Sequence, residues 1–185
     1  MTRPPRPHLA AVRTTVVAFV MSTIAGCAVN PATGERQLAL VSEQQEIAMG
    51  RGYSREVDQQ MGLYPDEALT RYVDGIGQRL AAASERPDLP WRFAVVDDDV
   101  VNAFALPGGY IYVTRGILAY FNSEAELAAV LGHEIGHVTG RHSVEQMSRQ
   151  QLASLGLGIG SVLYSPIQNL SGMLSQGLGV LFLKY

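Results

Sequence analysis

The segment AELAAVLGHEIGHVTGRH, residues 125–142, constrains this chain most, because it predicts a helix and a chemistry together. Ser123 precedes the segment and Glu126 follows three residues later, which is the spacing of a helix capping box. We therefore expect a helix that begins near Glu124. Alanine and leucine favour its continuation, and Gly140 is expected to end it.

The chemistry lies in the pattern H-E-x-x-H. His133 and His137 are four residues apart, so on a helix they are offset by about 40° and both imidazoles can reach one metal ion. Zinc accepts imidazole nitrogens, and Glu134 lies beside the pair, where it can take the proton of a zinc-bound water. The alternative is a pair of solvated or core histidines. It is disfavoured because a buried glutamate beside them would be costly without a cation.

Composition narrows the possible classes of protein. The 185 residues suffice for one domain, and 47% of them are apolar, unlike a disordered polar chain. The net charge is −3 and no long basic run is present, which excludes nucleic acid as an expected partner.

The N-terminus has the features of an export signal. Arginines precede the apolar residues 14–24, which are too few for a comfortable membrane span. Ala25 and Gly26 come before Cys27, as in a bacterial lipobox, and Cys27 is the only cysteine, so no disulfide can form within the chain. We predict a lipoprotein signal peptide at 1–26, lipidation at Cys27, and an anchor and polar linker at 27–41. The alternative is an ordinary signal with a free cysteine.

The remaining patterns predict an α+β fold, mainly helical, with a small antiparallel sheet. The sheet is expected beside the helix that carries His133 and His137 (the histidine helix). The turn Pro107-Gly108-Gly109 is a hairpin signal. The aspartates 97–99 favour a solvated turn over a calcium site. The expected helices are 42–61, a segment from Pro65 through Leu80, and a short helix within 116–121; the expected strands are 91–97 and 110–114.

Three segments, SEAELAAVLGHEIGHVTGRHS, NAFALPGGYIYVTRGIL and NPATGERQLALVSEQQEIAMG, resemble the HtpX-like family of zinc metallopeptidases, in its lipoprotein or periplasmic branch. The resemblance implies a gluzincin fold with one zinc ion, His133 and His137 as metal ligands, and Glu134 as the catalytic general base. It also implies that the strand at 110–114 lies near the cleft and pairs with extended substrates.

The family's third zinc ligand is a glutamate on a later helix, which we expect beyond Tyr185. On a continuous helix Glu126 and Glu145 lie about 10 and 12 Å along the axis from the histidines and do not reach the ion. His142 would point away by about 140° and is not expected to be a ligand. The metallopeptidase domain, 42–185, is therefore expected to be incomplete at its C-terminus.

These features predict a zinc-dependent metalloendopeptidase that hydrolyses unfolded or extended envelope proteins, and the resemblance implies a role in outer-membrane quality control. The resemblance implies that the protein is anchored through Cys27 in the outer membrane facing the periplasm, and the outer-membrane assembly machinery is an expected partner. The contrasting hypothesis is a non-catalytic envelope lipoprotein acting as a chaperone or scaffold. Three alternative structures remain open for the apolar stretch 150–183: a buried helical hairpin, a membrane-contacting surface or a membrane span.

Overall fold

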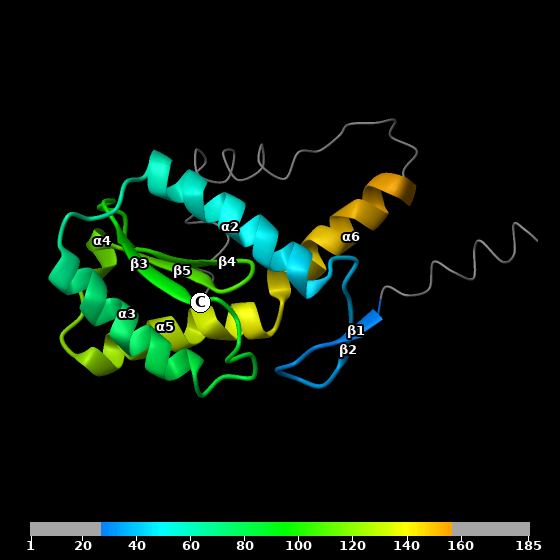
Figure 1. The fold of residues 1–185 in the computed structure, drawn as a ribbon, viewed down its shortest axis with the longest axis horizontal. Helices are drawn as coiled ribbons and strands as arrows, with labels where there is room; N and C mark the ends of the chain where they lie inside the picture. Colours follow the sequence, from blue (N-terminus) through cyan, green and yellow to red (C-terminus); the bar gives the residue numbers. More distant parts are fainter. Residues whose placement is uncertain (1–26, 157–185) are drawn as a thin grey trace, which may run out of the picture.

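The computed structural model describes residues 27–156, shown in Figure 1. The predicted signal peptide and most of the apolar stretch 150–183 lie outside these residues. No helix within the described range is long and apolar enough to cross a membrane. In chain order the elements are β1 Cys27–Val29, β2 Arg36–Leu38, α2 Glu43–Gln60, α3 Glu67–Ala81, β3 Arg92–Val96, β4 Ala103–Leu106, β5 Tyr110–Thr114, α4 Arg115–Leu118, α5 Glu124–Thr139 and α6 His142–Gly156.

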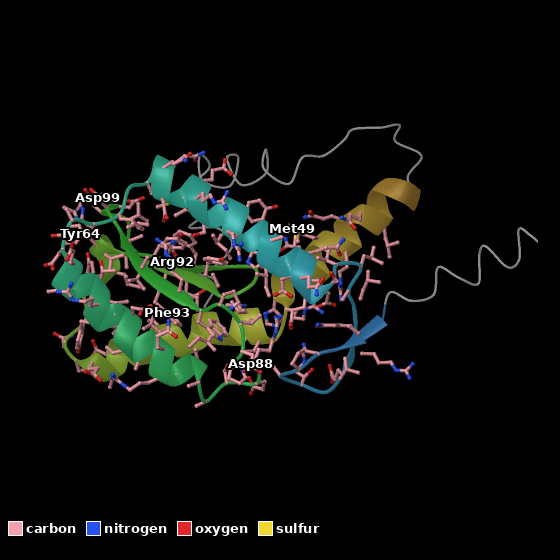
Figure 2. The ribbon with its side chains drawn as sticks, viewed as in Figure 1. Met49, Tyr64, Asp88, Arg92, Phe93 and Asp99 are labelled. Carbon is pink, nitrogen blue, oxygen red and sulfur yellow. The ribbon has the colours of Figure 1, made fainter. Side chains whose placement is uncertain are left out.

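A three-stranded sheet separates two groups of helices (Figure 1). The strands alternate their side chains, so Ala94 and Val96 pack with α2, whereas Phe93 and Val95 pack with α3 and α5. Figure 2 shows Arg92 between the sheet and α2, where its guanidinium binds Asp58, and Phe93 on the other side, toward α3. The α+β fold predicted from the sequence is confirmed.

The sheet is mixed and not purely antiparallel. β4 and β5 form the predicted hairpin, whose turn glycines Gly108 and Gly109 have φ values of 76° and 98°. β3, however, pairs in parallel with β5, in the strand order β3-β5-β4. Because β5 has a strand on each side, it cannot pair with a substrate, and that expectation for 110–114 is wrong. Within residues 27–156, β3 and β4 are the edge strands of this sheet.

The segment expected to be a polar linker forms a short hairpin of β1 and β2. The side-chain oxygen of Asn30 accepts hydrogen bonds from the backbone amides of Ala32 and Thr33, and Gly34 follows with a φ of 72°. Asn30 also donates its side-chain amide to the carbonyl of Gly140, 3.2 Å away, at the end of α5. The hairpin is thus tied to the end of the histidine helix.

The helix α5 begins and ends as its sequence predicts. The Ser123 hydroxyl accepts a hydrogen bond from the amide of Glu126, and Gly140 is the C-terminal cap. Arg141 then adopts a left-handed φ of 54°, and the separate helix α6 begins at His142. The helix that carries His137 therefore ends before His142. His142 does not lie where the spacing of one continuous helix would place it.

Candidate metal centre

The structure brings the two predicted ligands together on α5. The Nε2 atoms of His133 and His137 are 3.0 Å apart, and their ring planes are nearly perpendicular, at 88°. Two nitrogens bound to one tetrahedral zinc at about 2.0–2.1 Å stand roughly 3.3 Å from each other. The observed separation is close to this value, so the pair fits a shared ion with a small rotation of either ring.

The pair lies on an open side of α5. His133 is exposed and His137 is half-buried. A Cβ added at Gly132 or Gly136, the glycines that precede each histidine, would meet no described atom within 4 Å. The imidazoles are therefore reachable from solvent along this side of the helix.

Glu134 is buried beside the pair, with 4% of its surface exposed. Within residues 27–156, its Oε2 atom has no hydrogen-bond partner, and burial raises the pKa of its carboxyl to about 7. A buried polar atom without a partner is costly unless a ligand completes its surroundings. A carboxyl that titrates near neutrality also suits a group that accepts and returns a proton.

The surroundings of the second histidine favour a form that can bind a metal. Burial lowers the pKa of His137, and the nearby imidazoles of His133 and His142 lower it further. The lowered pKa favours the neutral imidazole, which has the lone pair that a metal ion requires.

A third ligand is not found in this part of the chain. No group of three His, Cys, Asp or Glu residues within 27–156 could hold a metal ion. Glu126 accepts a hydrogen bond from the amide of Asn122, and Glu145 pairs with Arg149 on the surface of α6. Within the described residues, neither glutamate forms a metal-binding group with the two histidines.

His142 is the site residue that the sequence reasoning missed. Its Nδ1 lies 2.8 Å from Nδ1 of His137, because the chain turns at Arg141 and brings His142 back onto α5. The prediction that His142 points away assumed a continuous helix and is wrong in that respect. Gly140 was the sequence signal for this contact, because a helix that ends at Gly140 no longer determines the direction in which His142 points.

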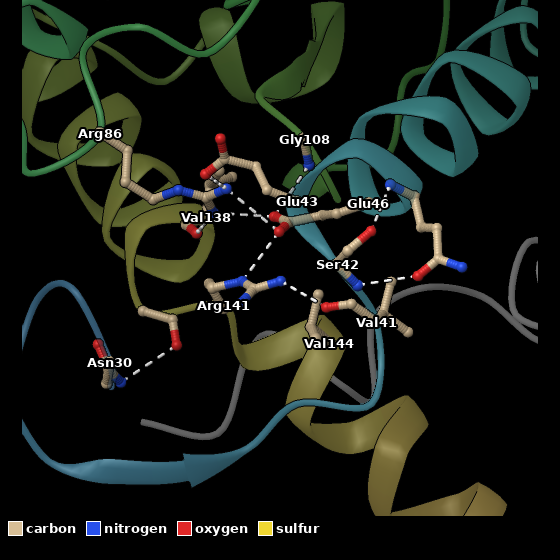
Figure 3. Close-up of polar contacts among 12 residues, drawn as sticks. Asn30, Val41, Ser42, Glu43, Glu46, Arg86, Gly108, Val138, Arg141 and Val144 are labelled. Carbon is tan, nitrogen blue, oxygen red and sulfur yellow. Dashed lines mark hydrogen bonds and ion pairs between the residues drawn. The ribbon is translucent and has the colours of Figure 1, made fainter. Parts of the chain in front are cut away.

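A buried cluster of charges fastens the end of α5 to α2 (Figure 3). Glu46, 1% exposed at its side chain, binds Arg86 through Oε1 and Arg141 through Oε2, each at 2.9 Å. Arg86 also donates to the carbonyl of Val138. The carboxylate is balanced by two guanidinium groups, as a buried charge requires.

Comparison with known proteins agrees with the geometry of the site, because it identifies a family of peptidases. Residues 67–184 match the sequence profile of "Peptidase family M48". A "Beta-barrel assembly-enhancing protease" of Yersinia pestis is 37% identical over 147 residues, which cover 77% of this chain and 30% of that protein. The protein of that name from Escherichia coli K12 is 33% identical over 147 residues, which also cover 77% of this chain and 30% of that protein.

A further relative is named as a mitochondrial metalloendopeptidase. The "Mitochondrial metalloendopeptidase OMA1" of Schizosaccharomyces pombe is 38% identical over 124 residues, which cover 64% of this chain and 36% of that protein. The chain therefore spans about a third of the length of these relatives.

Proposed function

Because the chain belongs to peptidase family M48, we propose that it is the metal-binding part of a zinc-dependent metalloendopeptidase. The observation that supports this most is the pair of Nε2 atoms 3.0 Å apart on α5, with the buried carboxyl of Glu134 beside them. His133 and His137 would hold the ion. When bound, zinc would lower the pKa of a coordinated water and polarise the scissile carbonyl.

In this proposal Glu134 moves the proton. Its carboxylate accepts a proton from the attacking water and then returns it to the nitrogen of the leaving amine. A pKa near 7 lets the same group act as base and then as acid without a large cost in either step. The exposed side of α5 gives a peptide access to His133, beside which the carboxyl of Glu134 lies buried.

The remaining protein ligand is proposed to lie after Tyr185. The sequence from 157 to 185 contains no His, Cys, Asp or Glu, so the part of the chain that follows the described residues supplies no such group. Catalytic zinc sites ordinarily use three protein ligands, and the family resemblance supplies a glutamate on a later helix.

The edge strand β4 is proposed to bind the substrate backbone. In the described range its only strand partner is β5, so its other edge has main-chain groups available for an extended peptide. Ala103 and Ile135 belong to one hydrophobic cluster, which places this strand beside the histidine helix. An extended segment paired with β4 would run along the metal site.

The names of the relatives and the N-terminal sequence support a proposal for the cellular role. Two of the relatives carry the name of a protease that enhances β-barrel assembly. We infer that the protein is lipid-anchored through Cys27 in the outer membrane, faces the periplasm, and cleaves extended segments of envelope proteins near the assembly machinery.

The deciding experiment uses the full-length protein. Zinc content is measured, and cleavage of an unfolded protein substrate is followed with and without a chelator, beside the Glu134→Gln variant. We expect one zinc per chain and cleavage that both the chelator and the substitution abolish. Cleavage that survives both would refute the proposal, and bound substrate without cleavage would favour the chaperone hypothesis.

A further inference from the structure

We propose that His142 is a positioning residue, which holds His137 in the tautomer and ring orientation that metal binding requires. This inference rests on the proposed function only in naming the metal at His133 and His137. It begins from the 2.8 Å contact between Nδ1 of His137 and Nδ1 of His142.

Two of the contacts that His137 makes use opposite sides of its ring. Nε2 faces His133 at 3.0 Å, whereas Nδ1 faces His142. The two nitrogens of one imidazole point in divergent directions, so His142 lies behind the ring and not on the side of the shared ion. His142 is thus placed to support a ligand rather than to be one.

The hydrogen bond to His142 determines which nitrogen of His137 carries the proton and which has the lone pair that binds a metal. Neutral imidazole carries one proton, and a metal at Nε2 requires that proton on Nδ1. His142 meets this need if its own Nδ1 accepts the hydrogen bond and its own proton is on Nε2. Metal-binding histidines usually donate their second N–H to a carboxylate, a carbonyl or a water, and an imidazole here takes that place.

The backbone makes room for this contact at Gly140. A Cβ added at Gly140 would lie 2.7 Å from Nε2 of His142 and 3.1 Å from its Cδ2. The φ of Gly140 is −71°, which any residue can adopt, so the backbone angle alone does not require glycine there. The space that the glycine leaves is taken up by the imidazole of His142.

The turn that carries His142 is held by buried contacts from distant segments. Arg141, in its left-handed conformation, donates to Glu46 and to the carbonyl of Val41, and Asn30 binds the carbonyl of Gly140 (Figure 3). A strained turn with this many fixed contacts keeps the position of the next residue well defined. His142 is therefore presented to His137 by the tertiary structure.

The test compares substitutions that differ in one acceptor atom. Asparagine places its side-chain oxygen where histidine has Nδ1, whereas glutamine places its oxygen one bond farther out. We compare His142→Asn, His142→Gln and His142→Ala with the unchanged protein. Long-range ¹⁵N NMR of the metal-free protein reports the tautomer of His137, and competition with a coloured chelator reports zinc affinity.

We expect the unchanged protein and His142→Asn to keep the Nδ1–H tautomer of His137. His142→Ala and His142→Gln should show mixed tautomers and bind zinc about 10- to 100-fold more weakly. Equal tautomers and affinities in all four proteins would overturn the proposal, and so would a His142→Asn protein that behaves like His142→Ala. Because the tautomer is read without metal, failure of zinc binding in every protein would count against the proposed function alone.

A second pair of variants keeps the histidine and moves it. Gly140→Ala should displace the ring of His142 and reproduce the tautomer change of His142→Ala. Gly75→Ala, on α3, is the control, since a Cβ there meets no described atom within 4 Å. Circular dichroism verifies that each variant is folded. A folded Gly140→Ala protein with an unchanged His137 tautomer would contradict the assigned role.

Discussion

Replacing Glu134 by glutamine should make the metal-free protein more stable at neutral pH, although it removes the proposed catalytic base. Burial raises the pKa of this carboxyl from 4.5 to about 7. One pKa unit corresponds to about 1.4 kcal/mol, so the shift amounts to roughly 3 kcal/mol of folding free energy. This magnitude is large for a single side chain and should be measurable.

The sign follows from which state holds the proton. Below pH 4.5 the carboxyl is protonated in the folded and the unfolded chain, and its burial causes no pH-dependent loss. As the pH rises toward 7, the unfolded chain releases the proton while the folded chain retains it, so the free energy of unfolding falls. Glutamine has no proton to release, and its own burial cost is the same at every pH.

The assay is urea unfolding at a series of pH values between 5 and 8, with a chelator present throughout. We expect the free energy of unfolding of Glu134→Gln to exceed that of the unchanged protein by a margin that grows by about 2–3 kcal/mol across this range. Glu85→Gln, at an exposed position, controls for the loss of one negative charge. Parallel pH profiles for Glu134→Gln and the unchanged protein would refute the reasoning.

Three further predictions concern the core, the charge cluster and the metal. Glu46→Ala removes the buried carboxylate that Arg86 binds and should cost about 3–5 kcal/mol in urea unfolding, whereas Glu43→Ala removes only an exposed partner of Arg86 and should cost less than about 1 kcal/mol. Equal losses would contradict the role of Glu46. Gly77→Ala puts a Cβ 2.3 Å from the ring of Phe93 and should cost about 1–3 kcal/mol, whereas Gly52→Ala, with nothing within 4 Å, should be neutral or stabilising. Zinc at 100 times its dissociation constant should stabilise the full-length protein by about 2.7 kcal/mol, and thermal unfolding should show this shift only while His133 and His137 are both present. A shift that persists in His133→Ala would place the metal elsewhere.

The start of α5, the spacing of its histidines and the glycine turn could be predicted because each depends only on residues close together in the sequence. The Ser123 hydroxyl and the amide of Glu126 are three residues apart, so the start of α5 could be predicted without knowing what the helix contacts. The spacing of His133 and His137 follows from helical geometry in the same way. The turn at Gly108 and Gly109 needs only the conformational freedom of glycine.

The contacts that surround the site depend on residues far apart in the chain. Nothing local indicates that β5 lies between β3 and β4, because the order of strands depends on which pairing buries the most apolar surface. Glu46 meets Arg86 and Arg141 over separations of 40 and 95 residues. Such pairs form only after the helices have packed.

The amino-acid sequence by itself determined the histidine pair, its glutamate and the helix that carries them, because these depend on interactions within a few residues. The burial that raises the pKa of Glu134 and the turn that brings His142 onto His137 were decided by the tertiary structure. The turn requires α2 and the N-terminal hairpin to be in place, because Glu46 and Asn30 hold it. The raised pKa of Glu134 requires the segments that bury α5, because desolvation is its cause.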